Sequence, residues 1–247
     1  MSSVAAPRPV LVTRPAGRGG TLRTQLEQRG IEVVHQPLIR LVPALGAELD
    51  AALRHLADGT YSLLVVTSRT AAEALVGAVV PSRTAIIAVG EGTAEELRAA
   101  GHPVAHVAAG SGAALVEEMP PAEDGAIVLF PASAAASRTV PEGLRSKGYR
   151  VHEVTAYRPL PVEPPAAVAV GLATGAYGAL ALTSPMIARR AAALGIHEST
   201  PIVTIGGPTS AAVREAGLAV GLQAPEPTDS ALALAVQQVL EAADAAP

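Results

Sequence analysis

The feature that most constrains this chain is an internal repeat. Residues 61–101 match residues 177–217 at a constant separation of 116 positions, with no gap. The identities fall at predicted strand ends and loops, where the Ala-rich composition of the chain would not place them by chance. They include Tyr61 with Tyr177, Thr67-Ser68 with Thr183-Ser184, Gly90 with Gly206 and Thr93 with Thr209.

A second match has a separation of 118 positions. It pairs Leu26, Gly30 and Val33 with Leu144, Gly148 and Val151, and the apolar openings Val10-Leu11-Val12 and Ile127-Val128-Leu129 fall in equivalent places. The chain therefore reads as two copies of one unit, at about 8–119 and 126–241. A period of roughly 110 residues is too long for a solenoid repeat, so it indicates a duplicated α/β unit and a molecule with two lobes.

Within each copy, short apolar runs alternate with segments of helical pattern. This alternation predicts parallel sheets with helices on their faces, connected by right-handed crossovers. The expected strands are 10–12, 31–35, 63–66, 85–89, 180–182 and 202–205, and the expected helices are 20–29, 70–79, 93–100, 187–194 and 208–216. Pro-rich segments at 37–43 and 159–165 follow the second strand of each copy and indicate connections between the lobes.

The composition excludes several classes of protein. With 49% hydrophobic and 16% charged residues the chain is not disordered, and a net charge of −4 gives no basic footprint for nucleic acid. The absence of cysteine excludes disulfides, thiolate nucleophiles and Cys-ligated metals. His102 and His106 form the closest histidine pair, but Pro103 separates them and no carboxylate lies nearby, so no metal site is expected. Residues 1–9 lack a signal-peptide pattern and no membrane span is visible, which predicts a cytoplasmic protein.

Anion binding is the chemistry that the repeated motifs favour. Thr67-Ser68 and Thr183-Ser184 each stand between a strand and a helix, as do 90–93 (Gly-Glu-Gly-Thr) and 206–209 (Gly-Gly-Pro-Thr). In such sheets ligands bind beyond the carboxyl ends of the strands, where free N–H groups and the helix dipole attract negative charge. Taken singly, Ser68, Ser184, Thr93 and Thr209 are better explained as helix N-caps than as ligand-binding residues. Four such positions, paired between two lobes, favour a site for a polyanion that includes Gly92 and Pro208.

Three further side chains are candidates. Arg14 ends the first strand beside these loops and is suited to carboxylate or phosphate, and Arg138 holds a weaker position at a helix start in the second copy. Tyr157 lies on the connection between the lobes, where it could donate a hydrogen bond to a ligand or serve only in packing. No Walker or Rossmann glycine pattern is present, and the single lysine, Lys147, is the only candidate for Schiff-base chemistry.

A set of short motifs is spread along nearly the whole chain in a specific order and spacing. They are Val10 to Pro15, the Leu26 to Gly30 pattern, Pro37, Leu63 to Ser68, Ala88 to Gly90 with Thr93-Ala94, Gly148 to Tyr157, Leu182 to Pro185 and Thr204 to Thr209. In these motifs the chain resembles uroporphyrinogen-III synthases. It departs from the family pattern at Arg69, where many relatives have another small or polar residue, and at the extra glycine of 206–209.

The resemblance implies a first lobe of 1–36 plus 162–247, a second lobe of 40–156, and linker strands at 37–39 and 157–161. It implies cyclisation of hydroxymethylbilane to uroporphyrinogen III, with inversion of the last ring, loss of water and no cofactor. Tyr157 would assist departure of the hydroxyl, and the anion-binding loops would hold the carboxylates of this linear tetrapyrrole. It further implies a monomer that receives its substrate from hydroxymethylbilane synthase.

Two alternatives remain open at this stage. The first is a non-catalytic cytoplasmic binder or sensor that closes on an anionic tetrapyrrole or a similar small molecule. The second is a different α/β enzyme, such as a sugar-phosphate or nucleotide transferase, although the phosphate-binding fingerprints of such enzymes are missing. Binding without isomer selectivity would favour the sensor, and stabilisation by nucleotides would favour the transferase.

Overall fold

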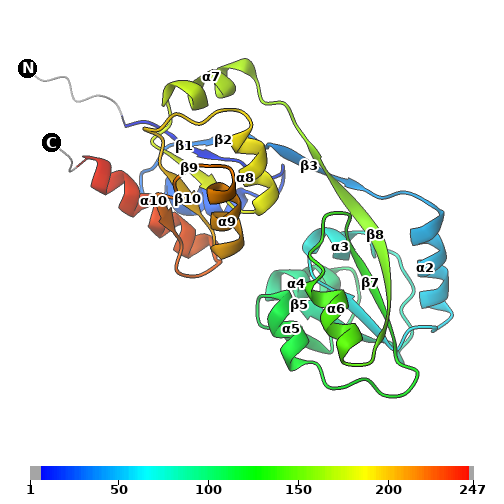
Figure 1. Cartoon of the computed structure of the whole chain (residues 1–247). Helices are drawn as coiled ribbons and strands as arrows, with labels where there is room; N and C mark the ends of the chain where they lie inside the picture. The colour runs from blue at the N-terminus through cyan, green and yellow to red at the C-terminus, as the bar shows by residue number, and fades with distance from the viewer. Residues whose placement is uncertain (1–6, 245–247) are drawn as a thin grey trace, which may run out of the picture. The chain divides into compact units, whose positions relative to one another are not determined.

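The computed structural model describes residues 7–244, which form two compact units (Figure 1). Unit 1 contains the chain up to Arg40 and from Leu160 onward, and unit 2 contains Leu41–Pro159. In Figure 1 the blue start of the chain shares one unit with its yellow and red end, while the cyan and green middle forms the other. Each unit is an α/β structure whose sheet is built mainly of parallel strands, as the alternating pattern of the sequence predicted.

The sheet of unit 1 has the order β11-β10-β9-β1-β2, and every neighbouring pair is parallel. Helices α1 and α10 pack together on a core that includes Leu22, Leu26, Leu232 and Val236, and helices α8 and α9 form a second packed pair. The elements are β1 (Val10–Val12), α1 (Gly20–Glu27), β2 (Val33–His35), α7 (Ala166–Thr174), β9 (Ala179–Leu182), α8 (Pro185–Ala192), β10 (Ile202–Thr204), α9 (Gly207–Glu215), β11 (Leu222–Gln223) and α10 (Asp229–Asp244).

The sheet of unit 2 has the order β3-β8-β7-β4-β5-β6. One face is covered by α2, α3 and α4, with Leu56, Leu75 and Leu97 in its core, and the other by α5 and α6, with Leu115 and Leu144. The elements are β3 (Ile39–Pro43), α2 (Ala47–Ala57), β4 (Leu63–Val66), α3 (Arg69–Glu73), β5 (Ala85–Val89), α4 (Glu91–Ala99), β6 (His106–Ala108), α5 (Gly112–Glu118), β7 (Ile127–Ser133), α6 (Thr139–Ser146) and β8 (Arg150–Pro161).

The strand registers confirm the internal duplication. In unit 1 Leu180 stands opposite Leu11 on one side and Ile202 on the other. In unit 2 the corresponding Leu64 stands opposite Leu129 and Ile86. Because Leu11 matches Leu129, the opening Val10-Leu11-Val12 is equivalent to 128–130, one residue later than the sequence comparison placed it.

The sequential copies 8–119 and 126–241 are not the compact units. Each unit combines the first two strands of one copy with the last three strands of the other copy. The exchange is possible because parallel strands join a sheet through hydrogen bonds with their neighbours, whatever their order along the chain. Periodicity along a sequence reports which segments are alike, and it does not report which of them pair.

Some element boundaries also differ from expectation. The helix expected over 70–79 ends at Glu73, since the amides of Leu75, Val76 and Ala78 bond three residues back and Gly77 has a φ of 79°. The expected linker segment 157–161 is the end of the long strand β8, and the segment expected at 37–39 lies mostly before β3. The chain passes between the units within these two strands, at Arg40–Leu41 and Pro159–Leu160.

Candidate functional site

The carboxyl edge of the sheet in unit 2 gathers several of the predicted residues. Strand β4 is followed by Ser68, and the neighbouring strand β5 is followed by Gly90 and the first turn of α4. Tyr157 comes to the same edge from β8, and its hydroxyl donates a hydrogen bond to Ser68 Oγ at 3.3 Å. The structure therefore brings together the predicted catalytic residue and one predicted binding residue.

A β-bulge aims Tyr157 at this edge. Ala132 of β7 stands opposite Thr155, but the next residue, Ser133, stands opposite Tyr157, which leaves Ala156 as an extra residue. Side chains alternate along a regular strand, and a bulge interrupts the alternation. Ala156 and Tyr157 accordingly both pack on the core beneath α2, α3 and α4. Bulges often re-aim a side chain next to an active site.

The two serines are confirmed as helix N-caps. Ser68 Oγ accepts a hydrogen bond from the amide of Ala71 at 3.2 Å, and Ser184 Oγ accepts one from Ile187 at 3.2 Å. The caps of the next helices are instead Gly90, with a φ of 76°, and Gly206. Each cap leaves the hydroxyl at the carboxyl edge of its own sheet.

The two threonines are not N-caps. Thr93 and Thr209 stand in the first turns of α4 and α9, with 5% and 2% of their surfaces exposed. Such burial leaves a ligand more access to neighbouring backbone amides than to the threonine hydroxyls. Pro208, also in the first turn of α9, has no N–H to offer, although its fixed φ suits a helix start.

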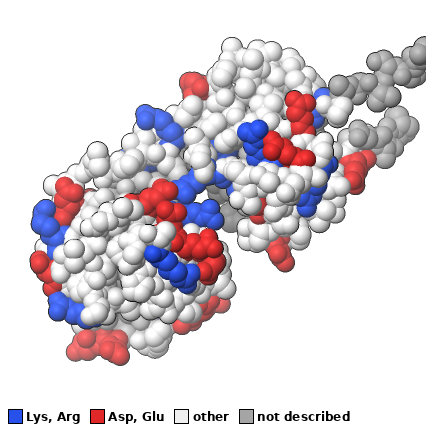
Figure 2. Space-filling view, turned by 180° about the vertical axis from the view of Figure 1, so that it is seen from behind, with Lys and Arg blue, Asp and Glu red and all other residues white. Residues whose placement is uncertain are grey.

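The two predicted arginines are both paired with carboxylates. Arg14 forms two hydrogen bonds with Asp229 at the start of α10, from Nη1 at 3.0 Å and from Nη2 at 2.5 Å. Arg138 is exposed and contacts Glu142 and, at 3.8 Å, Glu153. Both guanidinium groups therefore already have a carboxylate partner, and Arg14 ties the end of β1 to α10. In the face shown in Figure 2, basic and acidic side chains are likewise interspersed.

Arg69 is a residue that the sequence reasoning did not include in the site. It is exposed at the start of α3, and its guanidinium lies against Gly92 in α4 so closely that a Cβ on Gly92 would collide with it. Arg69 makes no hydrogen bond or ion pair with any residue of the described range 7–244. The sequence did single out Arg69, because it departs from the family pattern at the position directly after Ser68.

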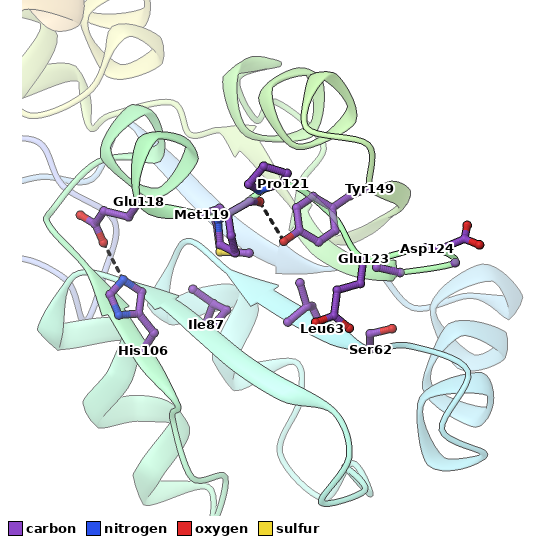
Figure 3. Close-up of a pocket in the computed structure, with 13 residues that line it drawn as sticks. Ser62, Leu63, Ile87, His106, Glu118, Met119, Pro121, Glu123, Asp124 and Tyr149 are labelled. Atoms are coloured by element: carbon purple, nitrogen blue, oxygen red, sulfur yellow. Dashed lines mark hydrogen bonds and ion pairs between the residues drawn. The ribbon is translucent and has the colours of Figure 1, made fainter.

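A cavity of about 590 Å³ lies elsewhere, at the amino edge of the same sheet (Figure 3). Leu63 begins β4, and Tyr149 directly precedes β8, so their strands run away from this cavity toward the Tyr157 edge. Tyr149 donates a hydrogen bond to the carbonyl of Pro120 at 3.1 Å, and burial, with the charge of Glu123, raises the pKa of its phenol. This cavity is thus not the place where the predicted site residues gather, and the geometry of those residues carries more weight.

Glu118 and His106 line this cavity and form a hydrogen bond, with His106 Nε2 and Glu118 Oε2 2.6 Å apart. A hydrogen bond from the amide of Ala109, and then the one from His106, hold the pKa of Glu118 below its ordinary value. Over residues 7–244 the structure offers no cluster of three or more His, Asp or Glu side chains able to hold a metal ion. No helix of that range is long and apolar enough to cross a membrane.

The fold and this edge define a class: a duplicated α/β protein of two units, in which hydroxyl and backbone donors stand at the carboxyl ends of parallel strands. The family model described as uroporphyrinogen-III synthase HemD matches residues 20–233 of this chain. The chain belongs to the uroporphyrinogen-III synthase family.

Individual relatives agree with this assignment. The chain is similar to the uroporphyrinogen-III synthase of Chlorobaculum parvum, with 28% identity over 229 residues that cover 86% of this chain and 91% of the relative. Its fold is similar to a uroporphyrinogen III synthase from Thermus thermophilus, with a TM-score of 0.67 and 19% identity over 96% of this chain and 100% of that one. A uroporphyrinogen-III synthetase structure from Helicobacter pylori gives a TM-score of 0.64 and 16% identity over 94% and 100%.

Enzymes of this family cyclise hydroxymethylbilane in tetrapyrrole biosynthesis. The predictions of the family, of the fold class and of an enzyme with this activity are confirmed. The roles of individual side chains remain predictions.

Proposed function

We propose that this chain closes hydroxymethylbilane into uroporphyrinogen III with inversion of the last pyrrole ring, and that Tyr157 assists the first step. The observation that carries the role of Tyr157 is the bulge in β8, which directs its hydroxyl to Ser68 at the carboxyl edge of unit 2. The extra residue of a β-bulge is left without its hydrogen-bond partners on the neighbouring strand. Bulges are nevertheless common next to active sites, where they redirect a side chain, and the bulge in β8 directs the Tyr157 phenol in this way.

The reaction begins when the terminal hydroxyl of the substrate leaves as water. The phenol of Tyr157 donates its hydrogen bond to that hydroxyl in place of Ser68 and helps it to depart, which leaves an azafulvene cation. Attack by the substituted carbon of the last ring gives a spiro intermediate, which fragments and recloses with the ring inverted. The proton delivered to the leaving hydroxyl is recovered when the newly bonded ring carbon loses its hydrogen.

The substrate's eight carboxylates provide the handles for positioning. In unit 2 we assign carboxylate binding to the edge that contains Ser68, Gly92 and Thr93, with Arg138 farther out. In unit 1 we assign it to Ser184, Pro208, Thr209 and the amides beside them. Holding a flexible chain in the conformation that favours the less accessible closure is catalysis by positioning, which can lower a barrier by several kcal/mol. Arg14 supports this through its bond to Asp229, by fixing the end of β1.

The test is a coupled assay in which porphobilinogen and a porphobilinogen deaminase make hydroxymethylbilane in situ. The products are oxidised and the porphyrin isomers are separated by chromatography. Uncatalysed closure gives the type I isomer, so we expect type III to dominate in proportion to added protein. Type I alone from a folded sample would reject the enzyme and leave a binder or sensor of anionic tetrapyrroles.

The role of Tyr157 has its own variant. Tyr157→Phe removes only the hydroxyl, and we expect kcat for type III formation to fall by about 10- to 100-fold without vanishing. Tyr177→Phe in unit 1 is the matched control, because it removes a phenolic hydroxyl from a buried tyrosine away from β8. An unchanged rate for Tyr157→Phe would remove Tyr157 from the mechanism.

Three further properties belong to this proposal. The enzyme works as a monomer in the cytoplasm and receives its substrate from hydroxymethylbilane synthase. Size-exclusion chromatography with light scattering checks that the protein is a monomer. A shorter lag in the coupled assay with hydroxymethylbilane synthase than expected for free diffusion of the substrate, at equal total activity, checks the hand-over.

A further inference from the structure

We propose that Arg69 is a substrate-binding residue of this enzyme, whose guanidinium takes one carboxylate of the tetrapyrrole at the carboxyl edge of unit 2. The inference deepens the proposed function and rests on it for the identity of the substrate. It concerns a residue at which this chain departs from the pattern of its family.

The first argument is that the Arg69 guanidinium is unpaired. Several exposed arginines of this chain are engaged by carboxylates, such as Arg98 with Glu91, Arg145 with Glu153 and Arg189 with Glu215. Arg69 has no such partner within the part of the chain that the structure describes. Glu91, the acidic residue at the start of the adjacent helix, is already occupied by Arg98. The positive charge of Arg69 is therefore available to a ligand.

The second argument is that the guanidinium has a defined position. It lies over Gly92, where any Cβ would collide with it, so the group uses the space that the missing side chain leaves. Unit 1 has neither residue at the equivalent positions, where Pro185 follows Ser184 and Pro208 replaces Gly92. The arginine and the glycine that accommodates it thus occur together, in one unit only.

The third argument is the neighbourhood. Arg69 directly follows Ser68, the residue that accepts the hydrogen bond of Tyr157. A carboxylate held by Arg69 would lie beside the group that we assign to the first chemical step. Guanidinium binds carboxylate through two parallel N–H···O bonds, which fixes orientation as well as position. Arg69 is therefore suited to orienting the substrate near Tyr157 as well as to attracting its negative charge.

The experiment compares Arg69→Gln with Arg54→Gln in the coupled assay. Arg54 is the matched control: it is exposed, in the same unit, unpaired among the described residues, and near the end of α2, which leads to the opposite edge of the sheet. We expect Arg69→Gln to raise KM about 10-fold, the loss of one charge-assisted contact, with kcat changed much less. Arg54→Gln should leave KM and kcat unchanged. Arg69→Lys should recover part of the loss in KM, since lysine keeps the positive charge but lacks the two parallel N–H donors of the guanidinium group.

A second variant and a binding measurement separate binding from folding. Gly92→Ala adds a methyl group that displaces the guanidinium, whose flexible stem can move, and it should raise KM in the same direction by a smaller factor. Calorimetric titration with uroporphyrin III, an octacarboxylate, should show weaker binding for Arg69→Gln and wild-type binding for Arg54→Gln. This readout does not depend on turnover.

The outcomes distinguish this inference from the proposed function. If the wild-type protein makes type III product but Arg69→Gln and Arg54→Gln have the same KM and bind uroporphyrin III equally, the inference is wrong and the function stands. If the wild-type protein makes no type III product, the proposed function fails, and the titration still decides whether Arg69 binds carboxylate. A lower melting temperature of Arg69→Gln with unchanged KM and binding would show a structural role and overturn the inference.

Discussion

Units 1 and 2 share the order of five strands and the register of the central ones, but they differ at both edges of the sheet. At the carboxyl edge, unit 2 presents Tyr157 and an unpaired Arg69, whereas unit 1 closes its edge with the ion pair of Arg14 and Asp229. The internal repeat aligns this ion pair with two alanines of unit 2, Ala132 and Ala113. Unit 1 thus has an arginine held by a carboxylate at this edge, where unit 2 has an arginine without such a partner among the described residues.

The amino edge differs as well. In unit 1, α10 runs for 16 residues, and Leu240 near its end packs against Gly178. In unit 2 the equivalent helix α5 has 7 residues and stops before Pro120-Pro121, and the cavity lined by Ser62, the counterpart of Gly178, opens beside it. A residue before proline is disfavoured in a helix, so this pair of prolines accounts for the shorter helix. The comparison shows that the sheet tolerates large changes at either edge as long as its central strands are kept.

The largest expected effect tests whether the central strands are equivalent. Leu11 and Leu129 are fully buried and occupy the same place in their sheets. Leu11→Ala and Leu129→Ala should each lower the free energy of unfolding by about 2–5 kcal/mol, through lost burial and a residual cavity. Amide hydrogen exchange should localise each effect to its own unit. Equal loss of protection in β4 and β5 from both variants would contradict the description of two separate cores.

The next effect concerns a buried polar contact that only unit 1 has. Thr204 Oγ1 and Ser210 Oγ are 2.6 Å apart, and the equivalent residues of unit 2 are Ala88 and Ala94. Ser210→Ala leaves the Thr204 hydroxyl buried without this partner and should cost about 1–3 kcal/mol. Adding Thr204→Ala should cost less than the single changes predict, with a coupling of about 0.5–3 kcal/mol by double-mutant cycle in urea. Strict additivity would mean that the contact does not matter.

A smaller effect is expected for the paired tyrosines at the start of β4 and β9. The hydroxyl of Tyr61 is 2.6 Å from His152 Nδ1, whereas the hydroxyl of Tyr177 makes no hydrogen bond with any of residues 7–244. Tyr61→Phe should lower the free energy of unfolding by about 1 kcal/mol, and Tyr177→Phe by clearly less. Urea unfolding of the two variants measures the difference. Equal losses would show that the His152 contact adds nothing.

The smallest effect is a pH dependence that unit 2 alone should carry. Glu118 has a lowered pKa, so its carboxylate adds stability that is present above its ordinary pKa of 4.5 and is lost as the pH falls through the lower folded value. Its counterpart in unit 1 is Leu234, which does not titrate. Glu118→Gln should flatten the acid side of the stability curve, while the neighbouring Glu117→Gln should not. If the free energy of unfolding falls equally steeply with decreasing pH in the wild type and in Glu118→Gln, Glu118 makes no such contribution.

The sequence predicted the parts of the fold that local chemistry determines. The runs 63–66 and 85–89 are continuous apolar segments bounded by loops, and they form β4 and β5 with these bounds. The exchange of segments between the copies did not follow from periodicity, because strand pairing is a long-range property. The family resemblance, and not the residue pattern, led us to expect a discontinuous first lobe.

The site was predictable only in part. Ser68 and Ser184 follow strands and cap helices, as their spacing indicated. The bulge that turns Tyr157 toward Ser68 depends on the register between β7 and β8, which a single sequence does not reveal. The partners of Arg14 and the position of Arg69 over Gly92 likewise depend on residues that are distant in sequence.

The most direct test of the central claim, that the chemical step belongs to the edge of unit 2, compares Ser68→Ala with Ser184→Ala. Both serines cap a helix through a hydrogen bond of 3.2 Å, so each variant should lose a similar stability of about 1 kcal/mol. Only Ser68 also holds the Tyr157 hydroxyl. We expect kcat for type III product to fall about 10-fold in Ser68→Ala, because Tyr157 is less well positioned. In Ser184→Ala we expect kcat to change much less, because the loss of a carboxylate contact away from Tyr157 should appear mainly as a higher KM. Equal values of kcat in the two variants, both folded, would contradict the assignment of the chemistry to unit 2.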